Sequence, residues 1–300
     1  MKPPFPSATP TWHNDTYASI SPQRPELSAT GKKVIIVGAG SGIGQETARA
    51  FATARASHVA LLGRRVASLN ETKSQLSTMS NTVSTSVHPV DVTQETALQD
   101  IATSIGKWDI LVLASGYVSE KGPMTAAETE DWWQSFEVPN YILKITQTNV
   151  KGTFLAIKSF VPTANPSHAT VLALTSGMTA APVKNFPNLS AYMTSKLAQV
   201  KVMEFLPLQH PHIFAATVHP GMVETDIFTK AGGVKSKLPM DTVQLPAHFM
   251  LWLSSPEAAF LNGRSVFANW DVEELKSQAE VIQSGQLMTA GIYGWPYPHM

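Results

Sequence analysis

The stretch KVIIVGAGSGIG, Lys33 to Gly44, joins an apolar run to a cluster of glycines, and a helical pattern follows it. The glycines are spaced G-x-x-x-G-x-G. Positions without side chains let a backbone approach a pyrophosphate, and the N-terminus of a helix offers it unpaired N–H groups. A turn that needs glycine only for its shape is the alternative, but the order of strand, turn and helix favours a dinucleotide. We expect cofactor contacts from Gly38, Ser41, Gly42, Ile43 and Gly44.

Outward from this loop, short aliphatic or β-branched runs alternate with helical patterns. The other expected strands are 58–63, 85–91, 109–115, 169–176, 213–220 and 263–268, and the expected helices include 44–54, 66–79, 94–105 and a segment around Tyr192. Near-continuous apolar strands separated by helices indicate a parallel sheet that is covered on both faces. The sequence therefore predicts an α/β, doubly wound Rossmann-type fold with a parallel seven-stranded sheet, whose ligands bind beyond the carboxyl ends of the strands.

Composition bounds the size and the organisation of the protein. With 300 residues, 43% of them hydrophobic, the chain is long enough for one large domain with a substantial core. Residues 1–31 are rich in Pro, Ser and Thr, and we expect a poorly ordered or surface-hugging arm. Residues 32–300 are expected to form a single Rossmann-type domain that ends in a C-terminal tail.

Charge and residue types exclude several function classes. The formal net charge is +0, which gives no electrostatic case for nucleic acid or an anionic membrane surface. The absence of cysteine excludes disulfides and cysteine-based metal sites, and His210 and His212 lack an acidic neighbour, so no metal site is expected. No signal peptide, transit peptide or membrane span is recognisable, and we expect a cytoplasmic protein.

The end of the second expected strand, ALLGRR, bears on the choice of cofactor. An acidic residue here would accept hydrogen bonds from the adenosine ribose, but Gly63 is followed by Arg64 and Arg65. Arginine can hold a 2′-phosphate through a bidentate, charge-assisted contact. The sequence therefore favours NADP(H) over NAD(H), with Arg64 the better candidate. The alternative is that an arginine here is a solvated residue flanking the next helix.

Tyr192 stands four residues ahead of Lys196, so a helix would place both side chains on one face. The pair alone is weak evidence, because Tyr-x-x-x-Lys also arises by chance. Ser176 strengthens it, since its hydroxyl ends an expected strand, where doubly wound folds bind ligands. A free tyrosine has a pKa of about 10, and a neighbouring ammonium together with an oxidised nicotinamide would lower it. The pattern predicts a phenol that exchanges a proton with a substrate.

Together, these motifs resemble the short-chain dehydrogenase/reductase family across about residues 32–268. The matching stretches are, in order, GAGSGIG, Asp91–Val92, NVKGTF at 149–154, Ser176, YMTSK and HPGMVETD at 219–226. The chain looks most similar to fungal NADP-dependent members that act in secondary metabolism or on small carbonyl compounds. The resemblance implies an enzyme that reduces a carbonyl, or oxidises a secondary alcohol, of a small molecule.

The resemblance also implies a role for each matching residue. Tyr192 would be the general acid or base, Lys196 would hold the nicotinamide ribose and lower the tyrosine pKa, and Ser176 would polarise the carbonyl. Asn149 would anchor a water that links the lysine to solvent. Cofactor contacts are implied for Asp91 and Val92 at the adenine, for Ser115 and Gly116 after the fourth strand, and for Pro220, Gly221, Val223 and Thr225 at the nicotinamide.

Two stretches depart from the family pattern. Where the family has Asn-Ala-Gly, this chain has LASG at 113–116, so an amide contact is missing that Ser115 could partly replace. The second departure is an insertion at 139–148, which begins with a proline inside a helical pattern. It makes Asn140 a competitor for the role of Asn149, and it puts an expected homodimer or homotetramer in doubt, because this helix normally forms half of the family's dimer interface. An insertion that loops out without consequence is the alternative.

The long connection after the sixth expected strand predicts a substrate loop at about residues 222–245. Gly232 and Gly233 are expected hinges, and apolar side chains of the loop would cover an apolar ketone or alcohol. Packing of these side chains within the subunit is the alternative. The expected lid and pocket residues are Met222, Ile227, Phe228, Leu238, Met240, Met178 and Phe186.

The sequence leaves three functions open. The first is an NADP(H)-dependent reductase or dehydrogenase. The second is a redox-neutral isomerase, cyclase or dehydratase on the same scaffold, which the changed 113–116 motif and the insertion favour. The third is a non-enzymatic nucleotide-binding protein, and the intact Ser176, Tyr192 and Lys196 argue against it.

Overall fold

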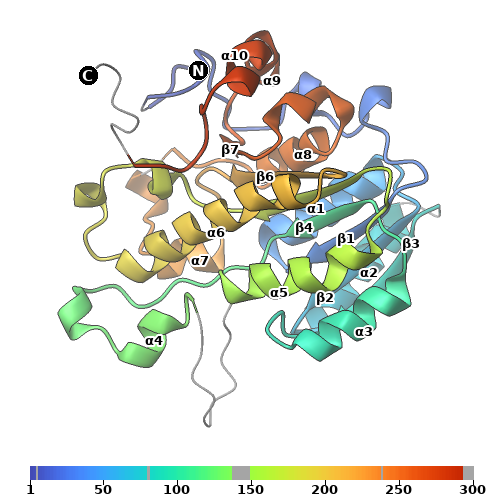
Figure 1. The fold of residues 1–300 in the computed structure, drawn as a ribbon, viewed down its shortest axis with the longest axis horizontal. Helices are drawn as coiled ribbons and strands as arrows, with labels where there is room; N and C mark the ends of the chain where they lie inside the picture. The colour runs from blue at the N-terminus through green and yellow to red at the C-terminus, as the bar shows by residue number, and fades with distance from the viewer. Residues whose placement is uncertain (5, 80–81, 137–148, 238, 293–300) are drawn as a thin grey trace.

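A parallel sheet forms the centre of the protein in the computed structural model, which describes residues 1–4, 6–79, 82–136, 149–237 and 239–292 (Figure 1). Its seven strands are ordered β3-β2-β1-β4-β5-β6-β7. They are β1 (Lys33–Val37), β2 (His58–Gly63), β3 (Ser84–Pro89), β4 (Ile110–Leu113), β5 (Ala169–Leu174), β6 (Ile213–His219) and β7 (Arg264–Phe267). The predicted doubly wound fold is confirmed, and the ends of the strands shift by at most two residues from those expected.

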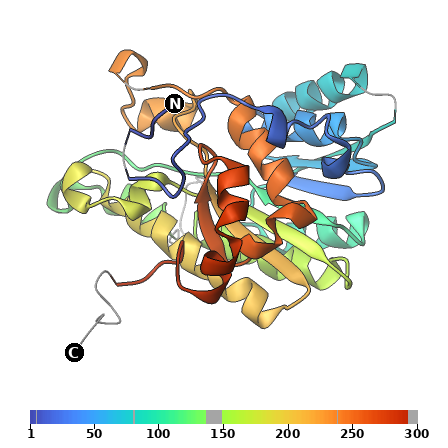
Figure 2. The ribbon, with the colours of Figure 1, turned by 90° about the horizontal axis from the view of Figure 1, so that it is seen from above.

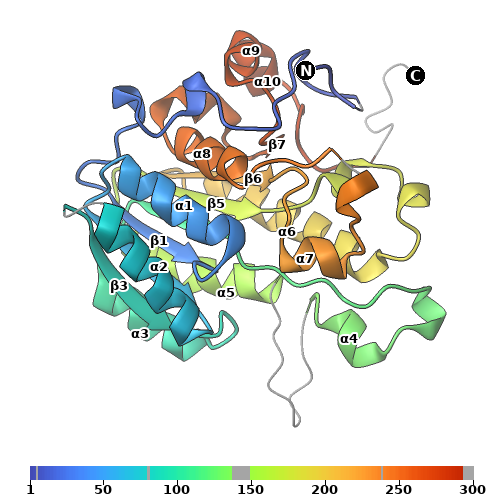
Figure 3. The same cartoon turned by 180° about the vertical axis from the view of Figure 1, so that it is seen from behind.

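Helices cover both faces of the sheet. The α-helices of the described residues are α1 (Gly42–Thr53), α2 (Val66–Met79), α3 (Glu95–Ile105), α4 (Thr129–Trp133), α5 (Lys151–Phe160), α6 (Ser190–Gln209), α7 (Asp226–Lys230), α8 (Gln244–Leu253), α9 (Val272–Ser277) and α10 (Ala279–Ser284). In Figure 1, α3, α5 and α6 lie in front of the sheet, and Figure 3 shows α1, α2 and α8 on the opposite face.

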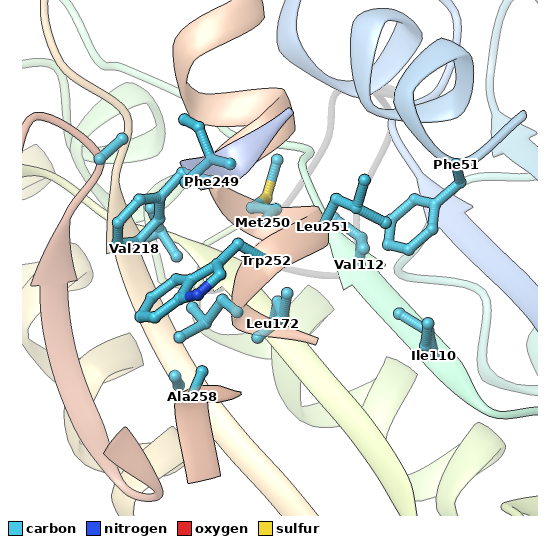
Figure 4. Close-up of a cluster of buried hydrophobic side chains, with 14 of the residues drawn as sticks. Phe51, Ile110, Val112, Leu172, Val218, Phe249, Met250, Leu251, Trp252 and Ala258 are labelled. Carbon is cyan, nitrogen blue, oxygen red and sulfur yellow. The ribbon is translucent and has the colours of Figure 1, made fainter. Parts of the chain in front are cut away.

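The central strands are buried throughout because both of their faces are covered. Every residue of β4, β5 and β6 is buried. On the face that α1 and α8 cover, Phe51, Phe249 and Trp252 pack over strand residues such as Val112 (Figure 4). A second cluster fills the other face around the buried Trp108. With both faces filled, the edge formed by the carboxyl ends of the strands is left for a ligand.

Residues 1–31 pack against the C-terminal part of the chain. Trp12 pairs with Trp270 in an isolated antiparallel bridge, and Trp12, Ile20 and Leu27 are all buried. Figures 1 and 2 show this arm, in blue, beside the orange and red segments that contain α8 and α9. The arm is therefore held along the surface, and its apolar side chains extend the core.

Several expectations fall on residues outside the described part of the chain. These are the helix break at Pro139, the competitor Asn140, the lid residue Leu238 and the tail beyond residue 292. Among the helices that the structure describes, none has both the length and the apolar character needed to cross a bilayer.

Candidate functional site

A cavity of about 580 Å³ opens along the carboxyl ends of the strands. The order of the strands reverses between β1 and β4, where a doubly wound sheet binds its ligand, and the loops that follow these two strands both contribute to the wall. Sixteen of the residues singled out from the sequence line it: Gly38, Ser41, Gly42, Ile43, Gly44, Arg64, Arg65, Asp91, Val92, Ser115, Gly116, Tyr192, Lys196, Pro220, Thr225 and Ile227.

The glycine loop leaves no room for side chains where it meets the end of β4. A Cβ atom on Gly38 would lie 2.7 Å from the backbone nitrogen of Ser115, and one on Gly44 would lie 2.2 Å from the Gly38 carbonyl oxygen. Gly38 also has a φ of +91°, which residues with side chains rarely adopt. Since α1 begins at Gly42, its first N–H groups, which have no partner within the helix, lie at the cavity wall. The loop can therefore hold an anionic group with its backbone.

Two arginines make the wall at the end of β2 cationic. Arg65 donates from Nη2 to the Ser41 hydroxyl over 3.2 Å, which ties it to the glycine loop. Arg64 lines the cavity beside it. The residues directly after Gly63 are these two arginines and not an acidic residue, so this wall is suited to an anion.

Asn149 is fully buried and clamps the chain just after β4. Its Oδ1 accepts from the Tyr117 N–H (3.0 Å), and its Nδ2 donates to the Tyr117 carbonyl (2.9 Å) and to Ser195 Oγ (3.0 Å). Asn149 Oδ1 and Lys196 Nζ each lie 3.7 Å from the position that a Cβ atom on Gly116 would take. Asn149 therefore holds the main chain of Tyr117 beside the lysine, in addition to any contact with water that the family resemblance implies.

Tyr192 and Ser176 are buried and hydrogen-bonded to each other. Burial raises the pKa of Tyr192 to about 12, and the hydrogen bond with Ser176 opposes this rise. Removal of the phenol from water penalises its charged form more than the hydrogen bond with Ser176 favours it. The expected lowering of this pKa concerns a site that also holds an oxidised nicotinamide, and it stays a prediction.

Lys196 lies one helical turn further along α6, and two acceptors hold its amino group. Its Nζ donates to the Leu174 carbonyl (2.8 Å) and to Gln199 Oε1 (2.9 Å), and Gln199 donates in turn to Thr153 Oγ1 (2.8 Å). Burial lowers the pKa of Lys196 to about 7. The charged and neutral forms of this side chain are therefore both populated near neutral pH.

The segment after β6 forms the wall opposite the glycine loop. Thr225 Cγ2 lies 3.5 Å from the position that a Cβ atom on Gly42 would take. Pro220 and Thr225 line the cavity, but Gly221 and Val223 do not. The side chain of Val223 is buried in the main core, and a cofactor contact from this residue stays a prediction.

An apolar cluster extends the site on the far side of the phenol. The expected pocket residues Met178, Phe186 and Ile227 pack against this cluster, so they lie beside Tyr192. The buried members of the cluster are Val118, Leu189, Tyr192 and Met193, and its partly buried members are Met178, Phe186, Ile227 and Ala231.

The two glycines of the substrate loop end a helix. Gly233 donates its N–H to the Phe228 carbonyl over 2.9 Å, and Gly232 has a φ of +68°, as is common after the last turn of a helix. The Phe228 ring fills the space beside Gly233, 2.4 Å from where a Cβ atom would be. Helix termination and close packing therefore account for these glycines without the hinge that we expected. Met222 and Met240 are half-buried and lie outside the apolar cluster.

Some residues of the site were not recognised in the sequence. Tyr117 and Val118 directly follow Gly116, so their position beside a motif was the available signal. Asp241 accepts a hydrogen bond from the Met222 N–H across a loop, and no local pattern indicates this contact.

Comparisons with known proteins agree with this geometry. A profile of the short chain dehydrogenase family matches residues 32–233. The chain is 31% identical over 299 residues to the short chain dehydrogenase mpl6 of Monascus purpureus, covering 93% of this chain and 96% of the relative. It is 32% identical over 288 residues to the short chain dehydrogenase andI of Emericella variicolor, covering 92% of this chain and 93% of the relative.

Solved structures share the fold. A short chain dehydrogenase from Burkholderia cenocepacia in complex with NADP matches with a TM-score of 0.67 and 18% identity, covering 82% of this chain and 99% of that chain. At this identity, the likeness concerns the fold alone. The profile match covers more than half of the chain, and the two relatives span nearly all of it. The chain therefore belongs to the short-chain dehydrogenase/reductase family of oxidoreductases, whose members bind a nicotinamide cofactor.

Proposed function

We propose that the protein is an NADP(H)-dependent oxidoreductase that reduces a carbonyl, or oxidises a secondary alcohol, of a largely apolar small molecule. The observation that carries this proposal is the shared cavity. Tyr192, which is hydrogen-bonded to Ser176, lines it together with Lys196, and the glycine loop lines it as well. A proton donor and a cradle for a dinucleotide in one space are what carbonyl reduction requires.

The residues present fit a nicotinamide dinucleotide. The glycine loop and the first N–H groups of α1 would hold the pyrophosphate, because Gly38, Gly42 and Gly44 line the cavity without side chains that would cover the backbone. Lys196 would hold the nicotinamide ribose. When bound, the reduced cofactor supplies the hydride for the carbonyl carbon.

A preference for NADP(H) is supported by the wall at the end of β2. Arg64 and Arg65 line the cavity there, and they stand directly after Gly63 where an acidic residue would accept hydrogen bonds from an unphosphorylated ribose.

The protein's own residues would manage the proton. In reduction, Tyr192 donates its phenolic proton to the developing alkoxide, and a pKa of about 12 keeps the proton on the phenol until then. Ser176 donates a hydrogen bond to the same oxygen. Lys196 returns a proton to the phenolate, since its pKa of about 7 lets it exchange protons near neutral pH. Asn149, beside this lysine, would anchor the water that links it to solvent.

The substrate class follows from the apolar cluster around the phenol. Its members carry no charge, and Ile227, which packs against the cluster, also lines the cavity. A ketone or secondary alcohol with apolar groups next to the reacting carbon fits a pocket lined by these apolar side chains. A sugar would leave its hydroxyl groups there without hydrogen-bond partners. The similarity to the two Monascus and Emericella proteins supports a role in fungal secondary metabolism.

A homodimer is the assembly that we propose. Leu197, Phe205 and Leu208 share one face of α6 at helical spacing, and they are 44%, 53% and 79% exposed. Phe154 on α5 is also exposed. Large apolar side chains gathered on one face in contact with water are typical of a surface that a second subunit covers.

The proposal is tested by turnover of a panel of apolar ketones with NADPH, for the wild type and for Tyr192→Phe. We expect oxidation of NADPH by the wild type, a loss of at least about a hundredfold in the variant, and unchanged NADPH binding. Product formation without a net change in nicotinamide absorbance would favour the redox-neutral alternative. Nucleotide binding without turnover of any substrate would favour the non-enzymatic one.

A further inference from the structure

Partly buried polar contacts join the N-terminal arm to residues that lie behind the wall of the cavity. Asn14 donates from Nδ2 to Asp241 Oδ1 over 2.5 Å, and its carbonyl accepts from the Thr242 N–H over 2.9 Å. One residue earlier, the His13 N–H donates to the Asn269 carbonyl, and Asn269 Nδ2 donates back to the His13 carbonyl, both over 2.8 Å. The arm is therefore fastened to two C-terminal segments at this point.

Asp241 passes this contact on to the main chain of the wall. Its Oδ2 accepts from the Met222 N–H (2.6 Å), and its own N–H donates to the Met222 carbonyl (3.0 Å). Burial raises the pKa of Asp241, and hydrogen bonds from the Met222 N–H, Asn14 and Asn269 oppose the rise. One residue thus holds both main-chain polar groups of Met222, and the arm supplies one of the donors that keep its carboxylate in place.

Gly221 provides the space that this carboxylate occupies. It has a φ of +86°, and a Cβ atom there would lie 2.3 Å from Asp241 Oδ2 and 3.2 Å from Asn269 Oδ1. A side chain at this position would push the carboxylate off the Met222 N–H. Gly221 does not line the cavity, and the need for glycine at this position therefore comes from the carboxylate of Asp241 packed against it.

The main chain that Asp241 holds continues directly into the cavity wall. Pro220, just before it, lines the cavity, and so does Thr225, which lies over Gly42 of the glycine loop. A shift of residues 221–222 would change the space opposite the loop. The arm lies outside residues 32–233, which match the family profile. The hydrogen bonds through which the arm supports the cavity wall are therefore not part of the matched region.

We propose that Asn14 and Asp241 are positioning residues, through which the arm sets the main chain of residues 220–223 against the nicotinamide half of the cofactor. Neither side chain lines the cavity, so both act through the backbone of Gly221 and Met222. The proposal rests on the proposed function, since it requires NADPH to bind in this cavity.

The test compares two ligands that share the adenosine half of the cofactor. NADPH contains the nicotinamide and 2′,5′-ADP lacks it, and calorimetry measures the affinity of the full chain for each. Asn14→Asp places a second carboxylate against Asp241. We expect it to weaken NADPH binding by about tenfold or more and 2′,5′-ADP binding by less than about twofold. In the double variant Asn14→Asp, Asp241→Asn, the donor and acceptor are exchanged, and NADPH affinity should return to within about threefold of the wild type.

Thr11→Ala is the matched control. Thr11 anchors the same arm through its hydroxyl to Glu274 Oε1 of α9 (2.6 Å), away from the wall, so both affinities should stay unchanged. An equal loss of NADPH affinity in Thr11→Ala, or no recovery in the double variant, would overturn the positioning role and indicate a general loosening of the arm.

Unchanged NADPH affinity in Asn14→Asp would also overturn the proposal. Retained binding of 2′,5′-ADP shows that a variant is folded. If Asn14→Asp loses both ligands, Asn14→Ala removes the donor without adding a charge, and loss of both ligands there as well counts against the proposal. Wild-type protein that binds neither ligand would instead refute the proposed function, and the positioning role with it.

Discussion

Tyr192 and Lys196 show how burial moves two neighbouring titratable groups in opposite directions. The pKa of the phenol rises to about 12, and the pKa of the ammonium falls to about 7. In both cases the loss of water penalises the charged form. The site therefore keeps a proton on Tyr192 at neutral pH, which agrees with the reductive direction of the proposed reaction, where the phenol is the acid.

Lys196→Met should change how stability depends on pH. Burial lowers the pKa of Lys196 from its ordinary value of 10.5 to about 7 in the folded protein, so between these values the unfolded chain binds more protons. Relative to the variant, the free energy of unfolding of the wild type should rise with pH in this window, by up to roughly 1.4 kcal/mol per pH unit. Below pH 7 the difference should be constant, because the lysine is then protonated in both states. Denaturant titrations at several pH values measure this, and parallel profiles would contradict it.

Arg64→Ala should discriminate between the two cofactors. If Arg64 holds the 2′-phosphate, NADPH affinity should fall by about tenfold or more and NADH affinity by less than about twofold. Fluorescence titration with each nucleotide measures the affinities. Arg55→Ala, at a position that does not line the cavity, is the control and should change neither. Equal losses for NADPH and NADH would rule out a phosphate clamp.

At the scale of elements, the sequence predicts those whose residues are contiguous and buried. α2 was expected at 66–79 and spans Val66–Met79, and the fully buried β5 and β6 begin at the expected residues. The glycine loop and the Tyr192–Lys196 pair were recognisable for the same reason, since each needs only a short stretch of chain. The direction of the Tyr192 pKa shift was not predictable, because it depends on burial by distant segments.

Contacts between distant elements account for the remaining differences. The hydrogen bonds of Asn149 to Tyr117 and the packing of Gly221 against Asp241 join residues that are far apart in the sequence. A motif of a few consecutive residues therefore does not predict them. Likewise, the Pro, Ser and Thr content of residues 1–31 indicated an arm without indicating its partners, because these lie at the other end of the sequence.

The start of α9 allows a test of one such contact. Asp271 accepts from the Glu273 N–H (2.9 Å) and the Glu274 N–H (3.0 Å), and it is paired with His13 of the arm (2.9 Å). Asp271→Ala should lower the free energy of unfolding by about 1–2 kcal/mol, and Asp271→Asn by less, because asparagine also caps helices. Denaturant titration measures both, and an equal cost for the two variants would contradict the capping role.

The contribution of Asp271 to the free energy of unfolding depends on pH. Burial raises the pKa of Asp271, but hydrogen bonds from His13 and from the first N–H groups of α9 outweigh it, so the pKa is lowered from 3.8. The stabilisation of the fold by the ionised Asp271 is therefore fully present above pH 3.8, and it is lost as the pH falls through the pKa of Asp271 in the folded protein. The stability difference between the wild type and Asp271→Ala should shrink in acid.

At the scale of the whole molecule, the exposed face of α6 predicts the behaviour of the protein in solution. Phe205→Glu places a charge at this face and should convert the proposed dimer to a monomer, which light scattering during size-exclusion chromatography measures. Val183→Glu, at a 75% exposed position outside α6, is the control and should leave the mass unchanged. A wild type that is monomeric throughout would refute the dimer.

The docking of the arm also relates the site to the order of synthesis. Asn14 is made early, and its partner Asp241 follows 227 residues later. Since a domain folds as a unit once enough of its chain has emerged, the arm can dock only after residue 241 has been made. A chain that stops before this point lacks the carboxylate that holds the main chain of Met222.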